Sequence, residues 1–182
     1  AKLLQEIGTK AQTIEFDLEC DRLKPDFPES RIVCCSVSDG QTTIAYPWHG
    51  AAITATLELL KSPVPKIGWN LKYEARWIQA KHGFWVNNWV WDGNLAAHIL
   101  DNRSSITSLK FQAFVVLGQP PWDEEIKPYF KSNADEERLC GGNAINRIKD
   151  CDLGKLMHYN ALDAFLEWKM AEVQTKQLGV RL

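Results

Sequence analysis

Several features are absent from the chain, and each absence excludes a class of protein. No apolar run approaches the ~18 residues needed to cross a bilayer, so we expect no membrane partner. The five cysteines include no Cys-x-x-Cys pair, which excludes the common zinc frameworks. Their odd number and the absence of a signal-peptide pattern favour a reducing cytoplasm. The net charge of -2 excludes a general basic surface, so any nucleic acid must be held by local contacts and metal ions.

The composition and the first sequence patterns predict a single α/β domain over residues 1–182. The chain has 182 residues, 45% of them hydrophobic, which is enough for a substantial core. Apolar and polar residues alternate over 13–19, and this alternation predicts a strand. Two more strands are expected at 31–38 and 42–46, with Asp39-Gly40 as the hairpin turn between them.

Helical and strand patterns alternate through the rest of the chain. Helices are expected at 53–61, 71–81, 94–100, 108–117 and 153–178, and short strands at 66–69 and 85–91, the second with an irregularity at Asn87-Asn88. Asn70, Asp92 and Asp152 are expected to cap helices. Residues 118–149 have an irregular pattern and are expected to form an insertion, with short helices near 124–130 and 134–138. This order predicts a mixed five-stranded sheet, with three antiparallel strands, a parallel extension and helices on both faces.

Two carboxylates, Asp17 and Glu19, share one face of the first strand. Side chains alternate with a period of two in a strand, so residues i and i+2 point the same way. A solvent-facing pair on an edge strand is the simpler interpretation, because charged residues are mostly exposed. The apolar residues that flank them and the place of this strand in the order favour a central strand instead.

A second polar pair, Tyr159 and Asp163, lies within the apolar pattern of the last helix. Residues i and i+4 are neighbours on a helix, so the phenol and the carboxylate share one face. An aspartate in a largely buried helix requires a partner, and a helix end or a salt bridge could supply it. If this helix meets the first strand, three carboxylates and a tyrosine converge. Close carboxylates stay ionised when cations lie between them, and Mg²⁺ or Mn²⁺ suits oxygen ligands. Two such ions can cleave a phosphodiester.

The third segment runs from Gly68 to Glu74. Considered alone, Asn70 is explained as a helix N-cap and Glu74 as an acidic residue in the first helical turn.

Taken together, the three segments resemble the DEDDy 3′–5′ exonucleases, most closely the proofreading domain of family-A DNA polymerases. Asp17-Leu18-Glu19 matches the Asp-x-Glu motif of that family, and Tyr159 with Asp163 matches Tyr-x-x-x-Asp. The run from Asn70 to Tyr73 matches Asn-x-x-(Phe/Tyr), but Glu74 stands where the family usually has aspartate.

The resemblance extends from about 13 to 176, and residues 91–101 and 108–110 also look like polymerase proofreading domains, especially those of phages. It implies a ribonuclease-H-like exonuclease fold that forms a single domain over 1–182. It also implies hydrolysis of single-stranded DNA from the 3′ end to nucleoside 5′-monophosphates with two divalent metal ions. The implied partners are the DNA 3′ end and a family-A polymerase domain, in the same chain or another. The implied location is the cytoplasm of a bacterium or a phage-infected cell.

The resemblance assigns a role to each matching residue. Asp17 would bridge both metal ions, which in such sites lie ~3.5–4 Å apart. Glu19 and Asp163 would complete the site of the metal that activates the attacking water, and Tyr159 would orient that water. Glu74 would hold the second metal, partly through water. Since glutamate adds about 1.5 Å of reach, we expect activity to survive with an altered metal preference.

Three further residues are implied to bind the substrate. Leu23 falls where the family has an apolar wedge beside the terminal base, and Asn70 and Tyr73 would help to bind the last nucleotides. Leu23 and Tyr73 could equally be core residues.

Three other functions stay open at the level of sequence. One is an RNase-D-like or Werner-type exonuclease that acts on RNA or structured ends, which would differ in contacts to the 2′-hydroxyl. A second is a non-catalytic module that binds nucleic-acid ends or has a structural role, its metal site weakened by Glu74. Retention of both carboxylates of the first motif and of the Tyr159–Asp163 pair argues against it. In the third, the motifs are coincidental in an unrelated α/β domain.

Overall fold

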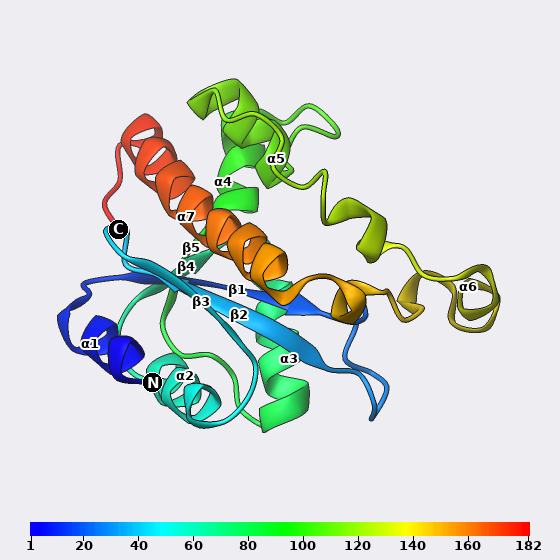
Figure 1. Cartoon of the computed structure of the whole chain (residues 1–182). Helices are drawn as coiled ribbons and strands as arrows, with labels where there is room; N and C mark the ends of the chain where they lie inside the picture. Colours follow the sequence, from blue (N-terminus) through cyan, green and yellow to red (C-terminus); the bar gives the residue numbers. More distant parts are fainter.

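The computed structural model describes residues 1–182 and contains one five-stranded sheet in the order β3-β2-β1-β4-β5 (Figure 1). The strands are β1 (Ile14–Cys20), β2 (Ile32–Ser38), β3 (Thr43–Pro47), β4 (Lys66–Gly68) and β5 (Trp89–Asp92). Strand β2 pairs antiparallel with β1 and β3, whereas β4 pairs parallel with β1 and β5. The predicted mixed sheet, with β1 as its central strand, is confirmed.

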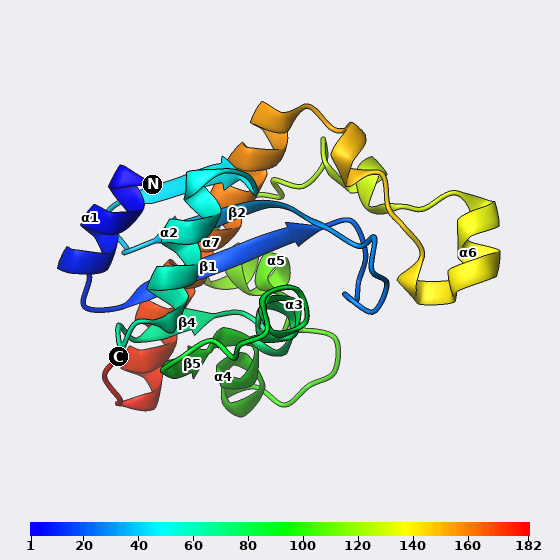
Figure 2. The ribbon, with the colours of Figure 1, turned by 90° about the horizontal axis from the view of Figure 1, so that it is seen from below.

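Helices cover both faces of the sheet (Figures 1 and 2). One face carries α1 (Lys2–Lys10), α2 (Ala51–Lys61) and α3 (Lys72–His82), and the other carries α4 (Gly93–Leu100), α5 (Leu109–Gln112) and α7 (Leu153–Leu178). Helix α1, which was not expected from the sequence pattern, buries Leu4 and Ile7 in the main core.

The main core lies between β1 and the helices α1, α2 and α3. Ile14, Phe16 and Leu18 of β1 are all buried in it. The ring of Phe16 stacks on that of Trp89 with centroids 5.2 Å apart, and Trp77 of α3 is fully buried. Because side chains alternate along a strand, the residues between these apolar ones point to the opposite face, where α7 lies.

Helix α7 crosses that opposite face and contacts β1, β2 and β3. Its predicted N-cap is confirmed, since the Oδ1 of Asp152 accepts a hydrogen bond of 2.9 Å from the backbone N–H of Lys155. The hairpin turn packs against the same helix. Gly40 in that turn has a φ of 84°, and a Cβ there would collide with the indole of Trp168.

Two local predictions are wrong near α3 and β5. Asn70 does not cap α3, because its φ of 63° lies in the left-handed region and its side chain makes no capping bond. The carboxylate of Asp92 accepts the backbone N–H groups of Asn70 at 3.0 Å and Leu71 at 3.1 Å instead. Asp92 also caps α4, as predicted. Strand β5 begins at Trp89 and not at residue 85, since Asn88 has a φ of 56° that interrupts extended backbone.

The segment 108–149 is more irregular than a simple helical pattern predicts. The expected helix over 108–117 consists of α5 followed by a π-helical turn, η1 (Ala113–Leu117). The insertion contains short elements: η2 (Lys127–Phe130), α6 (Ala134–Cys140), η3 (Gly141–Asn143) and η4 (Ile148–Asp150). Helix α6 buries none of its residues and projects from the rest of the domain (Figures 1 and 2). No helix in the structure has the length and apolar character needed to cross a membrane.

Candidate metal centre

Three carboxylates converge where β1 meets α7. Asp17 and Glu19 come from β1 and Asp163 from α7, and each offers an oxygen that lies within 4.8 Å of the other two. Glu19 and Asp163 are buried, and Asp17 is partly accessible. We call these three residues the acidic cluster. Its oxygen-only donor set fits a hard divalent cation such as Mg²⁺ or Mn²⁺.

The carboxylates of the acidic cluster tend to stay protonated unless a positive charge lies beside them. Burial, and then the negative charge of Asp163, raises the pKa of Asp17 to about 7. Burial is also the main reason why the pKa of Glu19 is raised, and the charges of Asp17 and Asp163 add to it. A bound divalent cation would replace these protons, because it stabilises the ionised carboxylates.

Two donors, from the buried Asn160 and the partly buried Trp122, orient the carboxylates. The side-chain amide of Asn160 donates to Oδ2 of Asp17 at 2.6 Å, and its backbone carbonyl accepts from Ser36 at 2.9 Å. The indole N–H of Trp122 donates to Oδ1 of Asp163 at 2.8 Å. The sequence motifs do not mark these residues as site residues. The available signal for Asn160 was an amide directly after Tyr159 in the apolar pattern of the last helix, whereas nothing local marked Trp122.

Tyr159 lies at the edge of the acidic cluster and contacts a lysine that sequence analysis did not assign. The ammonium of Lys110 donates to the hydroxyl of Tyr159 at 2.8 Å, and it lies 3.8 Å from Oδ1 of Asp163. Burial, followed by the charge of Asp163, raises the pKa of Tyr159, so the phenol stays protonated. The phenol can therefore donate a hydrogen bond at the edge of the site.

Glu74 lies outside the acidic cluster but close enough for the charge of Asp17 to act on its carboxylate. Its carboxylate is buried at 4% exposure, and its Oε2 has no hydrogen-bond partner. Burial, and then the charge of Asp17, raises its pKa. A buried carboxylate oxygen without a partner is costly, and a cation held jointly with Asp17 would remove that cost.

A further acidic pair lies behind the cluster, on the same faces of β1 and α7. Glu15 is fully buried, and neither of its carboxylate oxygens has a hydrogen-bond partner. Burial, and then the charge of Asp17, raises its pKa. Burial, and then the charge of Glu15, raises the pKa of Glu167. The period of β1 already placed Glu15 on the face of Asp17, but only the fold pairs it with Glu167.

A cavity of about 740 Å³ opens beside the acidic cluster. Glu19 connects the two, and Leu23 and Tyr73 also line the cavity. Leu23 is 58% exposed, so it is not a core residue, whereas Tyr73 is partly buried against the main core. Asn70 is exposed and does not line the cavity. The insertion supplies much of the far wall, including Phe130.

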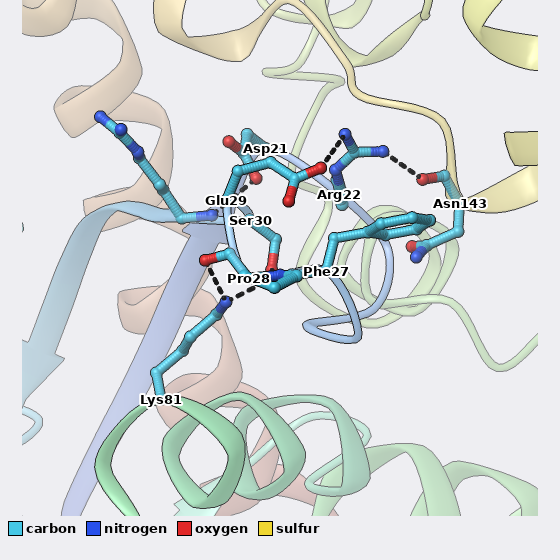
Figure 3. Close-up of polar contacts among 9 residues, drawn as sticks. Asp21, Arg22, Phe27, Pro28, Glu29, Ser30, Lys81 and Asn143 are labelled. Atoms are coloured by element: carbon cyan, nitrogen blue, oxygen red, sulfur yellow. Dashed lines mark hydrogen bonds and ion pairs between the residues drawn. The ribbon is translucent and has the colours of Figure 1, made fainter.

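The loop after β1 is fixed in place by the insertion and by α3 (Figure 3). The guanidinium of Arg22 donates to the carbonyl of Asn143 at 3.0 Å. Asp21 accepts the backbone N–H of Arg31 at 2.8 Å, and Lys81 of α3 donates to the carbonyl of Phe27 at 2.9 Å. These contacts hold Leu23 at the cavity, because it follows Arg22 directly.

Comparisons with known proteins give matches among solved structures only. No protein-family model matches the chain, and no curated protein matches it. Brucella melitensis NrnC with bound Mg²⁺ is 14% identical, with a TM-score of 0.69 over 94% of this chain and 76% of that chain. Escherichia coli RNase D, an exoribonuclease involved in structured RNA processing, is 12% identical, with a TM-score of 0.70 over 98% and 43%. The POL domain of Pol1 from M. smegmatis, in complex with DNA primer-template and dNTP, is 11% identical, with a TM-score of 0.66 over 98% and 26%.

These likenesses establish the fold. The chain has the expected ribonuclease-H-like fold, a mixed five-stranded sheet flanked by helices. Proteins that share a fold at such low sequence identity can act on different substrates, so the activity of this chain has to be inferred from its site.

Proposed function

We propose that the chain is a metal-dependent 3′–5′ exonuclease that hydrolyses single-stranded DNA ends to nucleoside 5′-monophosphates. The observation that carries the proposal is the convergence of Asp17, Glu19 and Asp163 within 4.8 Å. The adjoining cavity of about 740 Å³ has room for the end of a strand. Among proteins of this fold, one has been solved with Mg²⁺ and another in complex with DNA.

The motif resemblance assigns a role to each residue, and the positions of most of the side chains support these roles. Two metal ions bound at the acidic cluster would activate a water and stabilise the departing 3′-oxygen. Asp17, Glu19 and Asp163 would hold these ions, with Glu74 beside Asp17 as a further ligand. The protonated hydroxyl of Tyr159 would orient the attacking water. Leu23 and Tyr73 would contact the terminal nucleotide in the cavity, and Asn70 would act from outside it.

The proposal also includes a preference for DNA over RNA and a role in proofreading. The motif resemblance to family-A polymerases supports them, with a polymerase domain as partner in the same chain or another. An RNA substrate is the second candidate, since RNase D and RRP6 from Trypanosoma brucei have a similar fold.

Digestion of 5′-labelled single-stranded DNA and the matched RNA, with Mg²⁺, Mn²⁺ or chelator, tests the proposal. We expect a ladder that shortens from the 3′ end, with faster cleavage of DNA. Chelator should abolish it, and Asp17→Asn should slow it by more than ~100-fold, because even outer-shell partners of metals typically cost 10–100-fold. Faster cleavage of RNA would favour the second candidate. No cleavage with either metal, but retained binding of the 3′ end, would support a non-catalytic end-binding module.

A further inference from the structure

One cationic side chain, Lys110, lies beside the acidic cluster. Its ammonium is 3.8 Å from Oδ1 of Asp163 and 2.8 Å from the hydroxyl of Tyr159. It also lies over two aromatic rings, 4.9 Å from the centroid of Tyr159 and 5.2 Å from that of Trp122. Among the salt bridges of the chain, one involves the acidic cluster, and Lys110 is its cation.

The backbone around Lys110 holds this ammonium in place. Helix α5 is capped by Ser108, whose hydroxyl accepts the backbone N–H of Phe111 at 3.3 Å. Leu109 is buried at 8% exposure and packs with Leu166 and Met170 of α7. Because Leu109 anchors α5 on α7, the next side chain is fixed beside Asp163, which lies one helical turn before Leu166.

The ammonium acts on the same carboxylates that would bind metal. The ammonium of Lys110 lies 3.8 Å from Oδ1 of Asp163, and each of the three carboxylates offers an oxygen within 4.8 Å of the other two. A divalent cation at the cluster would be held by the same negative charges. Two cations within a few ångströms repel each other, so the ammonium and the metal ion compete for one set of negative charges.

We infer that Lys110 is a built-in counter-ion that lowers the affinity of the acidic cluster for divalent metal. The inference rests on the proposed function. The ammonium offsets part of the negative charge of the cluster in the metal-free protein, and its repulsion of the metal ion weakens metal binding. A strand end brings phosphate charges that offset this repulsion, so metal loads more tightly together with substrate than alone.

Titration of the metal-free protein with Mn²⁺, followed by calorimetry, tests the inference without measuring activity. We expect Lys110→Met to bind Mn²⁺ about tenfold more tightly than wild type, because a positive charge near the ion is removed. Lys110→Arg keeps the charge and should stay close to wild type. Addition of a single-stranded DNA end with phosphorothioate linkages should tighten Mn²⁺ binding more for wild type than for Lys110→Met.

Lys169→Met is the matched control. Lys169 pairs with Glu172 at 2.9 Å and lies 5.6 Å from the ring centroid of Phe165. Its side chain is 34% exposed, against 36% for Lys110, but its partner is not in the acidic cluster. We expect its Mn²⁺ affinity to equal that of wild type.

Equal or weaker Mn²⁺ binding by Lys110→Met would overturn the inference while leaving the metal centre intact. If Lys110→Met does not fold, as judged by thermal unfolding, the same outcome for Lys110→Gln, which retains a donor for Tyr159, would overturn it. Wild type that binds no Mn²⁺, like Asp17→Asn, would overturn the proposed metal centre and the inference together.

Discussion

The two faces of strand β1 differ in chemical character, since one is apolar and the other is acidic. Toward α1, α2 and α3, the strand presents Ile14, Phe16 and Leu18, all buried in the main core. Toward α7, it presents Glu15, Asp17 and Glu19, next to the carboxylates of α7. The same seven residues therefore supply apolar packing on one face and concentrated negative charge on the other.

The difference shows how the fold accommodates a cluster of buried carboxylates, which opposes folding. Burial of apolar side chains stabilises the folded chain, whereas burial of carboxylates raises their pKa and opposes folding once they ionise. A central strand that is packed on one face can hold carboxylates rigidly on the other. Substitutions on either face of β1, and in the residues that hold it, test this division of roles.

The largest effect is expected on the apolar face. Phe16→Ala should lower the free energy of unfolding by about 3–5 kcal/mol, because it removes a fully buried ring and leaves a cavity beside Trp89. Chemical denaturation measures the loss. Phe16→Leu should cost much less, and an equal loss for both would mean that the ring stacking matters more than the volume.

On the acidic face, the next effect concerns the hydrogen bond to Asp17. Asn160→Ala should lower metal affinity and cleavage rate by about 10–100-fold, because the carboxylate of Asp17 loses the donor that orients it. Mn²⁺ titration and single-turnover cleavage measure both quantities. Asn87→Ala, an exposed asparagine outside the site, is the control. Wild-type metal affinity in Asn160→Ala would show that Asp17 needs no such support.

A smaller effect should appear in the pH dependence of stability. The pKa of Glu15 is raised in the folded state, so the folded protein keeps a proton that the unfolded chain releases above pH ~4.3. The free energy of unfolding of the metal-free protein therefore falls as the pH rises above that value, by up to about 1.4 kcal/mol per pH unit for each such proton. Glu15→Gln, which cannot ionise, should reduce this fall.

Denaturation at pH 5, 6, 7 and 8 in the presence of chelator measures the slope. Glu58→Gln, at an exposed position of α2, is the control and should leave the slope unchanged. An unaltered fall for Glu15→Gln would mean that Glu15 is already ionised in the folded protein, contrary to its surroundings.

The smallest effect is expected at Glu74, beside the acidic face. Glu74→Asp restores the residue that the motif usually has, and we expect a rate change of less than about tenfold with a shifted Mg²⁺/Mn²⁺ preference. Cleavage rates at matched concentrations of the two metals measure the shift. An unaltered rate together with an unaltered preference would mean that Glu74 does not contact the metal.

The sequence by itself determined most of the elements and the faces on which the carboxylates of β1 and the Tyr159–Asp163 pair lie. The period of two in β1 separated the carboxylates from the apolar residues, and the spacing of four placed Tyr159 with Asp163 on α7. The Asp39-Gly40 hairpin and the Asp152 cap were equally readable, because each depends on neighbouring residues. The sequence predicted that the motifs converge only on the condition that β1 and α7 meet. The family resemblance implied that they do.

The tertiary structure alone decided which distant groups meet these residues. Lys110 and Trp122 reach the acidic face because α5 and the insertion pack beside α7, and no local period encodes those contacts. Asn70 does not cap α3 for the same reason, because the carboxylate of Asp92 at the end of β5 accepts the backbone N–H groups of Asn70 and Leu71. Local periodicity reports the direction in which a side chain points, whereas its partners depend on the way in which the elements pack.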